Sequence, residues 1–122
     1  MIILRAKRIL VVEDDSQNLY LTRFLLEQEG YEVITASDGL QAVEAACQKP
    51  DLILMDMLMP RMDGWTATRK IREQYGEDMP IVALTAYSMK GDRESIVEVG
   101  CNGYIAKPID VDEFCNQVEA FL

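Results

Sequence analysis

Residues 51–64 read Asp51-Leu52-Ile53-Leu54-Met55-Asp56-Met57-Leu58-Met59-Pro60-Arg61-Met62-Asp63-Gly64. A strand that is covered on both faces reads as continuous apolar sequence, so residues 52–55 predict a buried strand of a parallel sheet. Pro60 and the Asp63-Gly64 pair then predict a loop before the next helix. Asp56 is therefore expected at the carboxyl end of a strand, which is where open α/β sheets bind their ligands.

Short apolar strands alternate with longer helical patterns along the rest of the chain. Four more strands are predicted at residues 9–12, 31–35, 80–85 and 103–106. Helices are predicted between them: one that Gly30 ends, one capped by Ser37 or Asp38 that runs to Pro50, and others near 63–75, 88–99 and the C-terminus. Five strands that alternate with five helices predict an α/β fold with one doubly wound five-stranded parallel sheet. The first strand is expected inside the sheet, and the second and fifth at its edges.

Apolar residues at helical spacing identify the helix faces that we expect to pack on the sheet. The final helix is expected to begin near Asp110 or Asp112. The expected inward-facing residues are Leu21, Phe24 and Leu25 in the first helix, Leu40, Val43 and Ala46 in the second, and Phe114, Val118 and Phe121 in the last.

Length and composition limit the classes of protein that fit. With 122 residues the chain forms one domain, in which residues 1–7 are expected to be a short N-terminal extension. A net charge of -9 argues against a nucleic-acid or anionic-membrane partner. The absence of histidine excludes histidine-based catalysis. Cys47, Cys101 and Cys115 are expected to be buried thiols in a reducing compartment, and the chain has no signal peptide pattern, so we expect it in the cytoplasm.

Chemically active side chains follow the strands at their carboxyl ends. Glu13 and Asp14 follow the first strand, and Asp56, Thr85 and Lys107 end or follow the third, fourth and fifth. Three converging carboxylates repel one another unless cations are present. Lysine supplies one positive charge, and oxygen ligands of this kind suit Mg²⁺. Asp15, which is adjacent, is predicted to cap the following helix instead.

One carboxylate of such a site is free to act as a nucleophile. An aspartate can attack phosphorus and form an acyl phosphate, with charge accumulating on the phosphoryl oxygens. A metal ion, an ammonium group and a hydroxyl group directed at those oxygens are what this transfer requires. We therefore expect Asp14 to bind the metal directly and Glu13 to hold a metal-bound water. Lys107 and Thr85 are expected to contact the phosphoryl oxygens.

Four motifs together resemble the receiver domain of a two-component response regulator, of the stand-alone type related to chemotaxis regulators. The resemblance runs from about Arg8 to the C-terminus. It implies a flavodoxin-like (βα)5 fold with strand order 2-1-3-4-5. The motifs that carry it are residues 9–14 (Ile-Leu-Val-Val-Glu-Asp), residues 51–64 quoted above, residues 80–86 (Pro-Ile-Val-Ala-Leu-Thr-Ala) and residues 103–108 (Gly-Tyr-Ile-Ala-Lys-Pro).

The resemblance assigns roles to the acidic residues and to two of their neighbours. It implies that Asp56 is the phospho-acceptor. It also implies that Mg²⁺ is coordinated, directly or through water, by Glu13, Asp14, Asp56 and the backbone carbonyl of Leu58. Leu58 and Tyr87 occupy positions that tune the lifetime of the phosphorylated state in this family. One is apolar and the other bulky, so we expect them to hinder the hydrolytic water and to slow dephosphorylation.

The resemblance also implies a switch. Thr85 and Lys107 sense the phosphoryl group, and Tyr104 turns inward when Thr85 moves. The Lys107–Pro108 peptide is expected to be cis, so that the lysine is aimed into the pocket.

The implied function is that of a phosphorylation-controlled binding module in a phosphorelay. A partner histidine kinase or histidine phosphotransfer protein donates the phosphate, and a downstream protein binds the last two helices and the last strand. The chain is expected to catalyse only its own phosphorylation and dephosphorylation. Because it stops at Leu122, no output domain is expected.

Three other functions fit parts of the pattern. A phosphatase of the haloacid-dehalogenase type also uses an aspartyl nucleophile, but it needs a second acid at the position of Leu58. A flavin carrier shares the fold class, yet Glu13-Asp14-Asp15 would repel the phosphate of FMN. A degenerate receiver would act only as a scaffold, although here every residue needed for phosphorylation is present.

Overall fold

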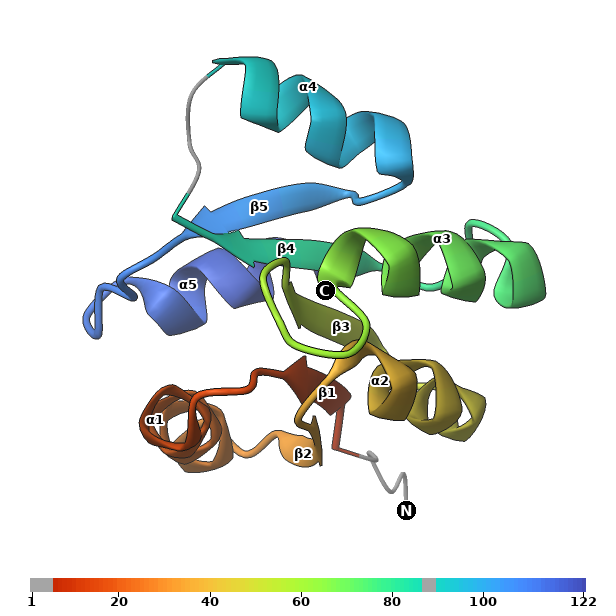
Figure 1. Cartoon of the computed structure of the whole chain (residues 1–122). Helices are drawn as coiled ribbons and strands as arrows, with labels where there is room; N and C mark the ends of the chain where they lie inside the picture. The colour runs from red at the N-terminus through yellow and green to blue at the C-terminus, as the bar shows by residue number, and fades with distance from the viewer. Residues whose placement is uncertain (1–5, 87–89) are drawn as a thin grey trace.

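The computed structural model describes residues 6–86 and 90–122. A five-stranded parallel sheet forms the centre of the molecule (Figure 1). The strand order is β2-β1-β3-β4-β5, which confirms the predicted α/β class and topology. β1 lies inside the sheet, and β2 and β5 form its edges. The strands are β1 (Arg8–Val12), β2 (Glu32–Ala36), β3 (Leu52–Asp56), β4 (Ile81–Thr85) and β5 (Gly103–Ala106).

Helices follow each strand, and aspartates cap three of them. Asp15, Asp38 and Asp63 each accept hydrogen bonds from backbone N–H groups in the first turn of α1, α2 and α3. The predicted caps at Asp15 and Asp38 are thereby confirmed. The helices are α1 (Ser16–Gln28), α2 (Gly39–Ala45), the short 3-10 helix η1 (Ala46–Gln48), α3 (Gly64–Tyr75), α4 (Lys90–Val99) and α5 (Phe114–Glu119).

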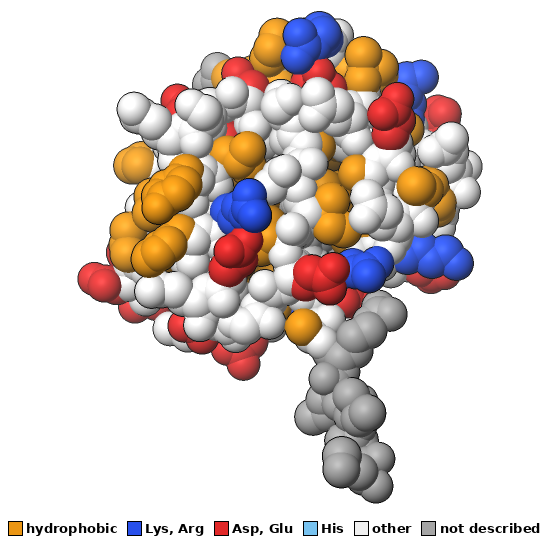
Figure 2. Space-filling view, turned by 90° about the horizontal axis from the view of Figure 1, so that it is seen from below, with side chains coloured by type: hydrophobic (Ala, Val, Ile, Leu, Met, Phe, Trp, Pro, Cys, Tyr) orange, Lys and Arg blue, Asp and Glu red, His pale blue; other side chains and the backbone are white. Residues whose placement is uncertain are grey.

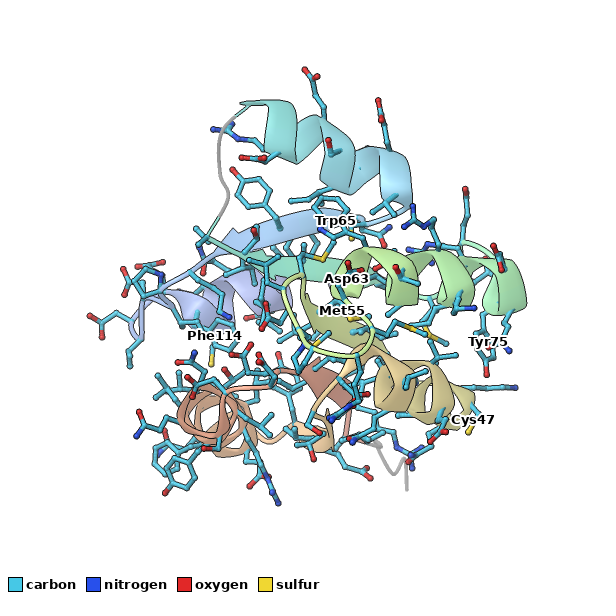
Figure 3. The ribbon with its side chains drawn as sticks, viewed as in Figure 1. Cys47, Met55, Asp63, Trp65, Tyr75 and Phe114 are labelled. Atoms are coloured by element: carbon cyan, nitrogen blue, oxygen red, sulfur yellow. The ribbon has the colours of Figure 1, made fainter. Side chains whose placement is uncertain are left out.

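The sheet separates two hydrophobic cores, because successive residues of each strand point to opposite faces. On one face, alternate strand residues such as Met55 pack against α2, α3 and α4. On the other face, strand residues such as Leu54 pack against α1 and α5, where Phe114 is the largest fully buried side chain. Figure 3 labels Met55 and Phe114 on these two sides of the sheet. Both faces of β3 and β4 are therefore buried, as their apolar sequences predict.

Two of the predicted inward-facing residues point outward instead. Phe24 is 48% exposed and stacks on Tyr20, which is also exposed, with ring centroids 6.2 Å apart. The inner face of α1 is formed by Thr22 and Leu26. Leu40 in the first turn of α2 is likewise 48% exposed. Hydrophobic side chains gather over α1 on the face seen in Figure 2.

The C-terminal helix is shorter than its sequence pattern suggests. The carbonyl of Asp110 accepts the N–H groups of Glu113 and Phe114 in a turn, and α5 begins at Phe114. Phe121 lies beyond the end of α5 but still packs, half-buried, on the α1/α5 core. The helix therefore starts two or more residues after the predicted aspartates.

The cysteines differ in environment, and one contradicts the expectation of buried thiols. Cys101 is buried and Cys115 is half-buried, whereas Cys47 in η1 is exposed (Figure 3). In η1 it is Ala46 that packs into the core, and the adjacent Cys47 therefore faces solvent. None of the helices in the described part of the chain has the length and apolar character needed to cross a bilayer.

Candidate functional site

The carboxyl ends of four strands bring the predicted site residues to one edge of the sheet. Asp56 and Thr85 are the last residues of β3 and β4, Glu13 and Asp14 follow β1, and Lys107 follows β5. They line a pocket of about 280 Å³. A larger hollow of about 600 Å³ beside Trp65, between α3 and α4, does not include these groups. The full lining of the smaller pocket is Glu13, Asp14, Asp15, Asn18, Asp56, Met57, Leu58, Leu84, Thr85, Ala86 and Lys107.

Three carboxylates converge in this pocket. Glu13, Asp14 and Asp56 each offer an oxygen, and these oxygens all lie within 4.8 Å of one another. Glu13 and Asp56 are buried, whereas Asp14 is exposed. Burial raises the pKa of Asp56, and the adjacent carboxylate of Glu13 raises it further. Partial desolvation and the nearby Asp56 also raise the pKa of Asp14. The pocket therefore holds more negative charge than its own surroundings neutralise.

Lys107 is the cation that faces these carboxylates. Its Nζ donates to both oxygens of Glu13, at 3.2 and 3.1 Å, and lies 3.4 Å from Oδ2 of Asp56. Burial alone would lower the pKa of Lys107, but the hydrogen bonds to Glu13 and the charge of Asp56 outweigh that effect and raise it. The ammonium group therefore stays charged beside the carboxylate of Asp56. The Lys107–Pro108 peptide is cis.

Two further contacts orient the acidic groups. The backbone N–H of Leu58 donates to Oδ1 of Asp56 at 3.2 Å, while the Leu58 side chain is 56% exposed beside the pocket. Nδ2 of Asn18, in the first turn of α1, donates to Oε1 of Glu13 at 3.2 Å. Sequence reasoning missed Asn18. Its place one helical turn after the acidic pair is the signal that could have found it.

The two residues expected to form the switch lie at different depths. Thr85 is 3% exposed and lines the pocket, and its carbonyl accepts the N–H of Lys107 at 2.9 Å. Tyr104 lies outside the pocket, on β5, half-buried against the core under α3 and α4. The guanidinium of Arg93 on α4 lies 5.7 Å from the centre of the Tyr104 ring, within the range of a cation–π interaction. Tyr87 lies outside the described residues.

The donor set fits Mg²⁺. Three carboxylates and one ammonium group leave a net negative charge, which a divalent cation would balance. All the ligand atoms on offer are hard oxygens, the type that Mg²⁺ takes in proteins. Within the described part of the chain, this trio is the cluster whose carboxylates come close enough together to share an ion.

A protein-family model matches most of the chain. The model described as the response regulator receiver domain matches residues 9–119. The polar-differentiation response regulators DivK of Brucella anthropi and Brucella ovis are each 40% identical over 118 residues, which is 95% of this chain and 96% of theirs.

Solved structures give the same result. The receiver domain of sensor histidine kinase PA1611 from Pseudomonas aeruginosa is 41% identical, with a TM-score of 0.86 over 96% of this chain and 98% of its own. That structure has a magnesium ion coordinated in its active site cleft. The chemotaxis protein CheY4 of Vibrio cholerae is 28% identical, with a TM-score of 0.91 over 97% of this chain and all of its own.

Proposed function

Because the chain belongs to the family of response regulator receiver domains, we propose that it accepts a phosphoryl group on Asp56 from a phosphohistidine of a partner protein. The observation that carries the proposal is a buried aspartate beside two further carboxylates and one lysine, all at the carboxyl edge of the sheet. Receiver domains interact with histidine kinases and with downstream targets. The phosphodonor is therefore a histidine kinase or a histidine phosphotransfer protein.

The transfer is a displacement at phosphorus. A carboxylate oxygen of Asp56 forms the new O–P bond as the N–P bond to the donor histidine breaks, and the electron pair stays on the imidazole nitrogen. The hydrogen bond from the Leu58 amide to Oδ1 leaves Oδ2 on the side of Lys107. Lys107 then exchanges part of its contact with the carboxylates for a phosphoryl oxygen. Thr85 supplies a hydroxyl group at the same edge.

Mg²⁺ would be held by Glu13, Asp14, Asp56 and the carbonyl of Leu58, and it would neutralise charge on the transferred group. The acidity of the trio supports this assignment, since the described pocket contains one lysine for four carboxylates, the trio and Asp15. The relative from Pseudomonas, whose structure has a magnesium ion coordinated in its own active site cleft, supports it as well.

The output is a change of protein-binding surface. Thr85 moves toward the phosphoryl group, and Tyr104 turns into the space behind it, away from Arg93. These movements shift the population from an inactive to an active conformation of the surface made by α4, β5 and α5, where the downstream protein binds. Apart from its own phosphorylation and dephosphorylation, we propose no catalytic activity.

Intact mass spectrometry tests the proposed reaction. The chain is incubated with phosphoramidate, with and without Mg²⁺, beside Asp56→Asn. We expect one added phosphoryl group on the parent with Mg²⁺, and none on the variant or in the absence of the metal. An adduct of equal yield on the variant would refute Asp56 as the acceptor.

A further inference from the structure

We propose that Asp38 and Arg61 form a clamp between α2 and the β3–α3 loop, residues 57–63, and that this clamp sets the affinity of the acidic site for Mg²⁺. The inference rests on the proposed function, because it takes Mg²⁺ as the ion of that site. Neither residue lines the pocket, so both would act by positioning the loop that does.

The ion pair of the clamp joins a buried anion to an exposed cation. Nε of Arg61 donates to Oδ2 of Asp38 at 2.6 Å, and the two side chains are 61% and 3% exposed, respectively. Oδ1 of Asp38 accepts the backbone N–H of Gln41 at 2.9 Å and so caps α2. The bond from Gln41 and then the one from Arg61 lower the pKa of Asp38. Asp38 is thus a fixed, charged anchor for the loop.

The backbone of the loop also requires an anchor. Arg61 has a φ of 65°, a left-handed conformation that is uncommon for any residue other than glycine, asparagine or aspartate. Conformations of this kind persist where the surroundings determine them, and they cluster near functional sites. The N–H of Gly39 donates to the carbonyl of Met62 at 3.0 Å, and a Cβ on Gly39 would lie only 2.5 Å from that oxygen. Two adjacent loop residues are therefore fastened to the start of α2 (Figure 1).

The fastened residues lie within a few positions of the proposed metal ligand. Leu58, whose amide binds Asp56, is three residues before Arg61. At the other end of the loop, Asp63 caps α3 through the N–H of Thr66, and Gly64 donates to the carbonyl of Met57. The clamp therefore holds the middle of a loop whose ends are held elsewhere. Releasing it would let the Leu58 carbonyl move relative to the carboxylates.

The test is the Mg²⁺ dissociation constant of variants, measured by calorimetry and by the fluorescence of Trp65, the single tryptophan, which follows the loop at the start of α3. Asp38→Asn removes the charge but keeps the cap, since asparagine caps helices as well as aspartate does. Arg61→Gln removes the cation. We expect each to weaken binding roughly 3- to 10-fold, less than the 10- to 100-fold typical when a partner bonded directly to a metal ligand is lost.

Three further measurements separate the clamp from a general structural effect. The double variant should bind no more weakly than the weaker single variant, because both changes remove one contact. Arg61→Lys, which keeps the charge, should restore most of the affinity. Arg69→Gln, a charge removal on the exposed surface of α3, should bind Mg²⁺ as the parent does.

The outcomes distinguish this proposal from the proposed function. If the parent binds Mg²⁺ and both single variants bind it equally well, the clamp is refuted while the phospho-acceptor function stands. The clamp is also refuted if the loss of Mg²⁺ binding free energy in the double variant equals the sum of the losses in the two single variants. A parent that binds no Mg²⁺ would overturn both proposals.

Discussion

At the scale of single residues, few contacts hold the carboxylate of Asp56 in the pocket. Asp56 is held by one amide on Oδ1 and by one ammonium group near Oδ2. Sequence reasoning placed Lys107 at this edge because it follows a predicted strand, but it did not predict the hydrogen bond from the Leu58 amide. It did not find Asn18, although the place of Asn18 one helical turn after the acidic pair was a signal. It also missed the pairing of Asp38 with Arg61, because no sequence pattern connects a helix cap with a residue of a distant loop.

Leu58 should control the lifetime of the phosphorylated protein. Its side chain is exposed beside the pocket, where we expect it to restrict the approach of water to a phosphoryl group on Asp56. We expect Leu58→Ser to speed dephosphorylation about 10-fold, which corresponds to about 1.4 kcal/mol in the barrier. The decay of the phosphorylated mass after removal of phosphoramidate measures the rate. Val97→Ser, at an exposed valine on α4, is the control, and equal rates for the two variants would sink the idea.

Asp56→Asn should stabilise the fold in the absence of Mg²⁺. Burial and Glu13 raise the folded-state pKa of Asp56, so its ionised form disfavours folding. The stability gained by the variant is therefore complete above the raised pKa and shrinks as the pH falls through it. We expect a melting temperature at pH 7 about 3–5 °C above the parent, on the order of 1 kcal/mol. Thermal unfolding between pH 4 and pH 8 measures it, and a gain that grows toward low pH would contradict the assignment.

At the scale of elements, strands could be predicted more accurately than helix faces. β3 and β4 are apolar on both faces, so a small error of register did not change their assignment. In α1, by contrast, Phe24, Leu25 and Leu26 are consecutive and cover most of the helix circumference, so periodicity does not decide which one faces inward. In α2, the close approach at Gly39 leaves Leu40 outside. Packing against the sheet decided the first case, and packing against Met62 of the β3–α3 loop decided the second.

Arg72 joins the ends of several elements opposite the site. Its guanidinium donates to the carbonyls of Gly100, Gly76 and Met79 and to Oδ1 of Asn102, at 2.6–3.0 Å. These bonds connect α3 to the start of β4, the end of α4 and the start of β5. We expect Arg72→Gln to cost roughly 2–3 kcal/mol in the free energy of unfolding, since several carbonyls lose a charged donor.

Urea denaturation measures that cost. Arg69→Gln, on the exposed surface of the same helix, should change stability by less than about 0.5 kcal/mol. If the two variants were equally stable, Arg72 would not have the structural role inferred here.

At the scale of the whole molecule, the carboxylates of the acidic site repel one another in a chain whose net charge is already -9. An ion that binds only the folded state raises the free energy of unfolding of the whole domain by RT ln(1 + [L]/Kd), where [L] is the concentration of the free ion. Events far from the pocket that require global unfolding should therefore become slower when Mg²⁺ is present.

Cys101 reports such unfolding, since it is buried in the core beneath α3 and α4, and burial raises the pKa of its thiol to about 11. Exposed Cys47 should react with a thiol reagent at once, whereas Cys101 should react only on unfolding. With Mg²⁺ at 100 times its dissociation constant, modification of Cys101 should slow by about 100-fold. Mass spectrometry of the labelled peptides measures both rates. If Mg²⁺ binds but the modification rate of Cys101 does not change, the expected link between Mg²⁺ binding and global unfolding is contradicted.

Chemical trapping shows which residue carries the phosphoryl group, and we propose that this residue is Asp56. After phosphorylation with phosphoramidate and Mg²⁺, borohydride reduces an aspartyl phosphate to homoserine, and peptide mass mapping then locates the change. We predict homoserine at position 56 alone, and none when Mg²⁺ is omitted. Homoserine at position 14 or 15, or a phosphoryl group that borohydride does not remove, would show that another residue is the acceptor.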